Sequence, residues 1–158
     1  MGLYNSAGHI EHKFLSIKDG KIFLKDSKIG FDCFEGKLKK IKTRKATFQN
    51  EEKEMLDLYF IDDEMARFVV STTKNSGVAR SILNNLANIK ETNIDEGRLR
   101  IHTYQKDSNY TKLQLFYQDR KLDWEYSDWN NKESDSKFFD IALACINNKL
   151  SDNDQNKP

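Results

Sequence analysis

The sequence predicts a mostly β domain with one helix in its interior and a second helix near its end. Short runs of alternating apolar and polar residues recur between turn residues, which is typical of strands. Ten phenylalanines, six tyrosines and two tryptophans favour pleated, half-buried surfaces. Helical spacing of apolar residues is clear in only two segments. The 158 residues suit one domain with a substantial core.

We expect the chain to have three parts. Residues 1–12 are polar and without pattern, which predicts a flexible arm. Residues 13–150 form the domain, and residues 151–158 form a solvated tail. The domain begins with two short alternating runs on either side of Asp19-Gly20, a dipeptide that predicts a tight β-hairpin.

A long strand is expected over residues 31–43. Its alternation slips at Lys39-Lys40, which predicts a β-bulge. The polar residues 44–54 indicate an extended loop or a hairpin tip. Further strands are expected over residues 55–61, 66–73, 98–102, 112–117 and 121–126.

The interior helix is expected to begin at Asn75-Ser76-Gly77. Val78, Ile82, Leu83, Leu86 and Ile89 then fall at helical spacing and give one apolar stripe. Either Ser76 or Asn75 can cap this helix. A second amphipathic helix is expected over residues 138–150.

The order of these elements predicts the fold more closely. Three strands, a helix and two strands is the order of the OB-fold, a five-stranded barrel with a helix between strands 3 and 4. A first strand that bends at a bulge also suits a small barrel. An SH3-like barrel lacks this helix, and a sandwich needs more strands. We therefore expect an OB-fold barrel with an additional N-terminal hairpin and C-terminal helix.

Residues 31–126 resemble the small single-stranded DNA-binding proteins of bacteriophages and mobile elements. The resemblance is found in Phe34–Leu38, in Asn75–Ser81 and in Leu115–Trp124. It implies an OB-fold that binds single-stranded DNA during replication or recombination.

A basic run is the strongest functional signal in the sequence. Cations at the end of the first long strand can neutralise phosphates and release counterions, which supplies sequence-independent affinity. Alternatively, these lysines protect a solvated strand edge from pairing with another chain. The run consists of Lys37, Lys39, Lys40, Lys42, Arg44 and Lys45, and Phe48 follows it.

Aromatic side chains are the second requirement, because bases stack on them. In the alternation of its strand, Tyr59 falls on the face that points away from the core, and Arg67 lies on the next strand. The remaining candidates lie around the last hairpins and at the helix start. They are Tyr104, Tyr110 and Trp124 for stacking, and Lys74, Arg98 and Arg100 for phosphates.

Composition and motifs argue against other classes. The net charge is +1, so any attraction for nucleic acid requires local segregation of charge. No apolar run approaches the ~20 residues that span a bilayer, and no secretory signal is visible. We therefore expect no membrane partner and a cytoplasmic location, in the host cytoplasm if a phage encodes the protein. Cys33 and Cys145 have no metal-ligand spacing and are expected to be buried.

No catalytic, metal or cofactor motif is found, since the three histidines are scattered and there is no Gly-rich phosphate loop or nucleophile elbow. Two hypotheses remain for a non-enzymatic protein. The first is sequence-tolerant binding of single-stranded DNA, or of RNA. The second is a protein-interaction or virion-associated structural module without nucleic-acid affinity, which docks through Phe138 and Phe139. In either case a homo-oligomer can form through the C-terminal helix.

Overall fold

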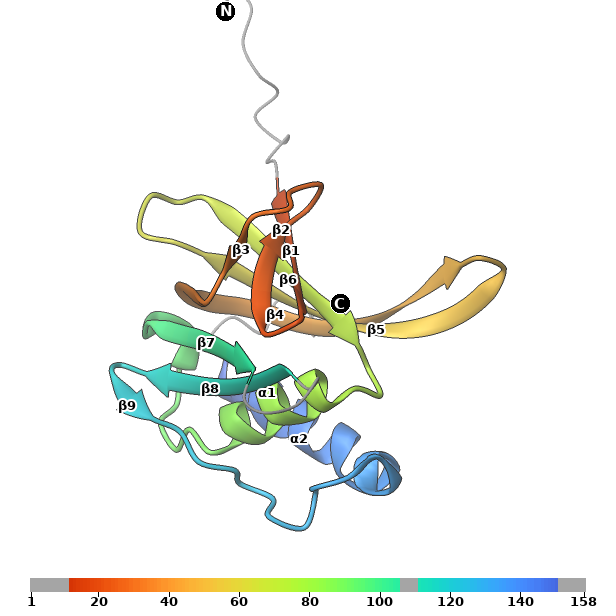
Figure 1. The fold of residues 1–158 in the computed structure, drawn as a ribbon. Coiled ribbons are helices and arrows are strands. Elements are labelled where there is room, and N and C mark those ends of the chain that lie inside the picture. Colours follow the sequence, from red (N-terminus) through yellow and green to blue (C-terminus); the bar gives the residue numbers. More distant parts are fainter. Residues whose placement is uncertain (1–11, 106–110, 151–158) are drawn as a thin grey trace, which may run out of the picture.

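The computed structural model describes residues 12–105 and 111–150, and within them the prediction of a mostly β chain with two α-helices is confirmed. Nine strands form one mixed sheet in the order β3-β2-β1-β6-β5-β4-β7-β8-β9 (Figure 1). The predicted arm and tail lie mostly outside the described residues. The elements are β1 (His12–Lys18), β2 (Lys21–Leu24), β3 (Gly30–Phe31), β4 (Cys33–Phe48), β5 (Glu51–Ile61), β6 (Arg67–Thr73), α1 (Gly77–Ala87), β7 (Leu99–Gln105), β8 (Thr111–Tyr117), β9 (Arg120–Lys121) and α2 (Asp135–Lys149), with 3-10 turns at Ile94–Glu96 and Lys132–Ser134.

The β4–β5 hairpin is longer than the sequence predicts. The predicted bulge is present, because the pairing register shifts between Leu38 and Lys40. Of the two alternatives for residues 44–54, the structure has the hairpin tip and not the extended loop, since pairing continues to Phe48 and Glu51 and the turn is only Gln49-Asn50. Both turn residues have positive φ, which matches the twist of a two-residue hairpin. The hairpin projects beyond the rest of the sheet (Figure 1).

The predicted five-stranded OB-fold barrel is not found as such, because the sheet that the described residues form has nine strands and does not close. In a five-stranded barrel made of β4 to β8, each of these strands would pair with two others of the five. β6 instead pairs in parallel with β1, from His12–Arg67 to Ser16–Ser71, and β8 pairs with β9. The pair between β6 and β8 that would close the barrel is therefore missing. The physical reason is that the hydrogen-bonding edge of β6 holds one further strand, and the N-terminal hairpin occupies it.

The predicted Asp19-Gly20 hairpin turn is confirmed, and it packs against the other half of the sheet. Both residues have positive φ. The Gly20 N–H donates to Thr111 Oγ1 at 2.9 Å, so the turn contacts the start of β8. A Cβ atom on Gly20 would lie 2.7 Å from Cβ of Gln105 at the end of β7. The hairpin thus reaches the half of the sheet that β6 does not pair with.

We expect Gly20→Ala to lower the free energy of unfolding by about 1–3 kcal/mol, because the added methyl group overpacks this contact. Gly77→Ala is the matched control, since a Cβ there meets only Arg80 Nη1 at 3.8 Å. That change should raise stability by about 0.4–1 kcal/mol by restricting the unfolded chain. Urea denaturation measures the free energy of unfolding of both variants. A Gly20→Ala variant as stable as the wild-type protein would contradict the close packing of the hairpin.

Helix α1 covers the inner face of the sheet. Ser76 is its cap, because its hydroxyl accepts a hydrogen bond from the Ala79 N–H at 3.1 Å. Ile82, Leu83 and Leu86 on its apolar stripe are fully buried, as the helical spacing predicted. The opposing strand residues form the other side of the same core, and they include Leu56, Leu58 and Phe60 of β5.

The segment after β8 differs from the prediction. The strand expected over residues 121–126 is wrong beyond Lys121, because an asparagine of α1 binds this backbone instead. Asn84 Oδ1 accepts from the Tyr126 N–H at 2.7 Å, and the Asn84 carbonyl accepts from Glu125 N–H. Cys33 is exposed and Cys145 is partly buried, so burial of both thiols is also not observed.

Among residues 12–105 and 111–150, no helix has the length and apolar character needed to cross a membrane.

Candidate functional site

Several of the predicted residues lie together on one side of the sheet, which we call the outer face. It is the side of β1, β4, β5 and β6 that is opposite Leu56, Leu58 and Phe60. Lys40 pairs with Tyr59 across β4 and β5, and Lys42 pairs with Asp57. Directly opposed residues of antiparallel strands point to the same face. Because Leu58, between Asp57 and Tyr59, is in the core, these side chains point outward.

Tyr59 lies at the centre of this face, surrounded by cationic side chains. Lys40 and Lys42 place their Nζ atoms 5.6 and 5.3 Å from the centre of its ring. The His12 ring of β1 meets Tyr59 edge-on at 5.9 Å. Arg67 pairs with His12, so it lies beside this cluster. The structure thus brings together Lys40, Lys42, Tyr59 and Arg67; the outward direction of Tyr59 was expected, and the alignment of the two lysines with it was not.

Arg44 is held by a buried carboxylate in the same face. Its Nε donates to Asp57 Oδ2 at 2.5 Å, and Ser71 Oγ donates to Asp57 Oδ1 at 2.6 Å. Asp57 is only 2% exposed, whereas the Arg44 side chain is 42% exposed. The ion pair therefore fixes the guanidinium at the surface but offsets part of its charge.

A groove of about 680 Å³ runs between the N-terminal hairpin and the projecting β4–β5 hairpin, and we call it the outer groove. Phe14 and Phe48 line it, and each is 47% exposed. Lys25 lies over the Phe14 ring at 5.8 Å, and Lys18 lies over the Phe23 ring at 5.4 Å. The groove thus pairs aromatic rings with cations.

Sequence reasoning missed the contribution of β1 and β2 to this groove, namely Phe14, Phe23, Lys18 and Lys25. Their alternation with Leu15 and Ile22 was a usable signal, because it places the phenylalanines opposite the core. The sequence did not indicate that β1 would pair with β6 and bring these rings beside β4.

The remaining cations of the basic run lie elsewhere. Lys39 donates to the Asp95 carbonyl at 3.2 Å, and Lys45 faces Glu52 at 3.7 Å on the opposite side of the hairpin. Lys37 lines a separate small pocket together with Asp62, Asp63 and Glu64. The predicted run is therefore divided between three surfaces.

Arg98 and Arg100 are neutralised within the chain. Arg98 lies 2.9 Å from Asp119 and 3.7 Å from Glu35, and Arg100 lies 3.5 and 3.6 Å from the same two carboxylates. Arg100 also stacks on Phe116 at 4.5 Å. These arginines have less charge to offer a phosphate than their sequence positions suggested.

Tyr104 and Trp124 lie in a second groove between β8 and the start of α1, which also includes Lys112 and Arg80. Tyr110 lies outside the described residues.

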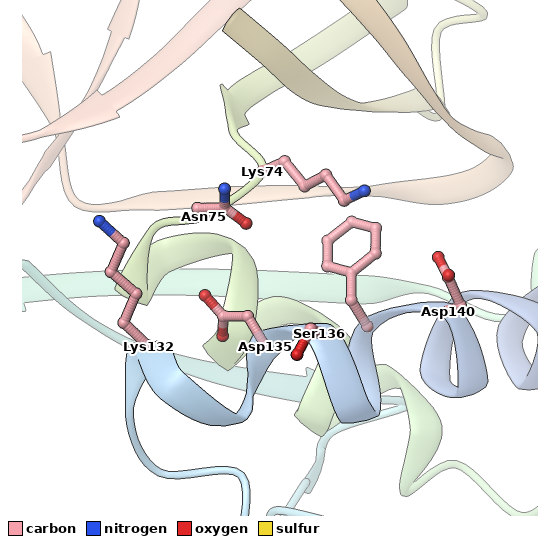
Figure 2. Close-up of a pocket in the computed structure, with 7 residues that line it drawn as sticks. Lys74, Asn75, Lys132, Asp135, Ser136 and Asp140 are labelled. Carbon is pink, nitrogen blue, oxygen red and sulfur yellow. The ribbon is translucent and has the colours of Figure 1, made fainter.

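Lys74 lines a third cavity of about 370 Å³ where the loop after β6 meets α2 (Figure 2). Its Nζ is 4.6 Å from the Phe139 ring and 3.3 Å from Glu54. Asp135 accepts hydrogen bonds from Arg80 Nε and from Trp129 Nε1, at 2.9 and 2.7 Å. These charges are engaged in holding α2 against the body of the protein.

The part of the chain that the structure describes contains no cluster of three or more histidine, cysteine, aspartate or glutamate side chains placed to hold a metal. Partial burial and the nearby Glu35 carboxylate raise the pKa of the Cys33 thiol, which makes it a weak nucleophile at neutral pH.

No protein-family model, curated protein or solved structure matches this chain. Its chemistry is therefore interpreted from the outer groove, where rings and cations lie together.

Proposed function

We propose that this protein binds single-stranded DNA without sequence preference, along the outer face and its outer groove, and acts on exposed single strands in replication or recombination. The observation that carries the proposal is the pairing of rings with cations across one face: Lys40 and Lys42 at Tyr59, and Lys25 at Phe14. Bases stack on such rings whatever their sequence, while lysines neutralise the backbone.

The arrangement of strands supports this proposal. Strands β4 to β8 with α1 between β6 and β7 have the order of an OB-fold, which is a partly open barrel. OB-folds bind oligonucleotides on the face of their strands 2 and 3, and β5 and β6 occupy these positions here. We infer an OB-type arrangement in which the N-terminal hairpin takes the closing edge and adds Phe14 to the binding face.

Single strands fit the groove better than a duplex does. The half-exposed rings of Phe14 and Phe48 can stack only on the faces of bases, and a duplex covers these faces by its own stacking. Each stacked base contributes about 1–3 kcal/mol by alanine substitution. A duplex would be limited to contacts with phosphates.

Fluorescence anisotropy with labelled oligo-dT at several salt concentrations tests the proposal. We expect binding that weakens as salt rises, with log K falling by about 0.7 per phosphate contact for each unit of log salt. A hairpin duplex of equal charge should bind more weakly, and oligo-rU measures the preference for DNA. The proposal is abandoned if oligo-dT does not bind at low salt, or if binding is independent of salt.

A further inference from the structure

The second groove, which we call the β8 groove, has a volume of about 640 Å³ and resembles the outer groove in its chemistry. Tyr104 from β7 and Trp124 from the segment after β9 both line it. Their side chains are 40% and 38% exposed, so each presents part of its ring to solvent. Elsewhere this chain buries its other tryptophan, Trp129, completely.

Of the two cations that line the β8 groove, Arg80 is paired with Asp135, and Lys112 makes no salt bridge among the described residues. Lys112 is the cross-strand partner of Tyr104, and it lies on the same face. Arg80 donates to Asp135 through Nε and Nη2, while its Nη1 lies beside Gly77 on the groove wall. Among the described residues that line this groove there is no aspartate or glutamate. Its electrostatic field therefore favours an anionic ligand.

The two grooves meet at the N-terminal hairpin. Lys18 lines the outer groove. Two residues later, the Gly20 N–H donates to Thr111 Oγ1, and Thr111 lines the β8 groove. Two extended residues span at most about 7 Å, so among the described residues the Asp19-Gly20 turn joins the two rims. A polymer that leaves one groove at Lys18 enters the other at Thr111.

We propose that the β8 groove is a second binding site for the same single strand of DNA, which passes over the Asp19-Gly20 turn. This inference rests on the proposed function of the outer groove. The bases of the strand stack on Tyr104 and Trp124, and its phosphates lie near Lys112. Once the first groove is occupied, the second contact is intramolecular, so long strands gain affinity that short strands lack.

Intrinsic fluorescence tests the second site, because the chain has only two tryptophans and Trp129 is buried. An oligo-dT of about 20 nucleotides, longer than the 4–16 that one OB-fold covers, should quench the wild-type signal. Trp124→Phe should keep the affinity, since phenylalanine still stacks, and should abolish the quenching. Tyr104→Ala/Trp124→Ala should weaken binding of this oligonucleotide by at least about 10-fold, given the stacking energies.

The matched control is Phe31→Ala, because Phe31 is an exposed ring that lines neither groove. It should leave affinity and quenching unchanged. If the wild-type protein binds oligo-dT but Trp124 is not quenched and the double variant binds normally, the second site is overturned and the outer groove stands. If the wild-type protein does not bind oligo-dT, the proposed function is overturned and the second site with it.

Discussion

Trp129→Ala is expected to lower the free energy of unfolding by about 3–5 kcal/mol, as large aromatic truncations in a core do. Trp129 has no exposed surface. Its ring stacks on Phe138 at 6.0 Å and meets Phe139 edge-on at 6.5 Å. Its Nε1 donates to Asp135 at 2.7 Å. The substitution therefore opens a cavity and removes a donor from a buried carboxylate. Urea denaturation followed by circular dichroism measures the loss.

Trp124→Ala is the natural control, because Trp124 is the other tryptophan and is only partly buried. Its effect should stay within about 1 kcal/mol, as for most substitutions outside the core. Similar losses in both variants would contradict the assignment of Trp129 as the residue that joins α2 to the rest of the protein.

This packing shows that the C-terminal helix is part of the fold. Phe139, Ala142 and Ile146 of α2 are buried, and Lys149 donates to the carbonyls of Ala87 and Ile89 near the end of α1. The docking surface considered at Phe138 and Phe139 is thereby reduced, since Phe139 is covered and Phe138 packs against the core. Ile141 is the large apolar residue of α2 that remains exposed.

Lys40→Glu/Lys42→Glu is expected to give the largest loss of DNA affinity. Both lysines lie at Tyr59 on the outer face. Removing two phosphate contacts should reduce the slope of log K against log salt by about 1.4, and the two new carboxylates should repel the strand further. Anisotropy titrations with oligo-dT over a range of salt measure both quantities.

Lys45→Glu/Lys137→Glu is the matched control, because it changes the net charge equally. Lys45 lies on the opposite face of the hairpin, and Lys137 is exposed on α2. This variant should retain most of the affinity and the full salt slope. Equal losses in the two variants would mean that binding depends on total charge and not on the outer face. Arg44 is left intact in both, since its removal would leave the buried Asp57 without its ion-pair partner.

Local signals made much of the fold predictable. The Asp19-Gly20 turn, the bulge at Lys39 and the Ser76 cap depend on residues close in sequence, and all three are present. The alternation around Tyr59 also predicted correctly that this ring would lie on the face opposite Leu56, Leu58 and Phe60, where the structure adds Lys40. The polar composition of residues 44–54 left an extended loop and a hairpin tip as alternatives, and the cross-strand pairs of the structure decide for the hairpin tip.

The sequence by itself therefore determined the order of most elements along the chain, the approximate positions of the two helices and the outward parity of Tyr59. Only the tertiary structure decided which strand β1 would pair with, and thus that Phe14 joins the binding face. It also decided that Asp119 and Glu35 would neutralise Arg98 and Arg100. The reason is physical: turns, caps and alternation depend on near neighbours, whereas contacts such as Gly20 with Thr111 join residues 91 positions apart. Such contacts form through the packing of the whole domain, and no local pattern specifies them.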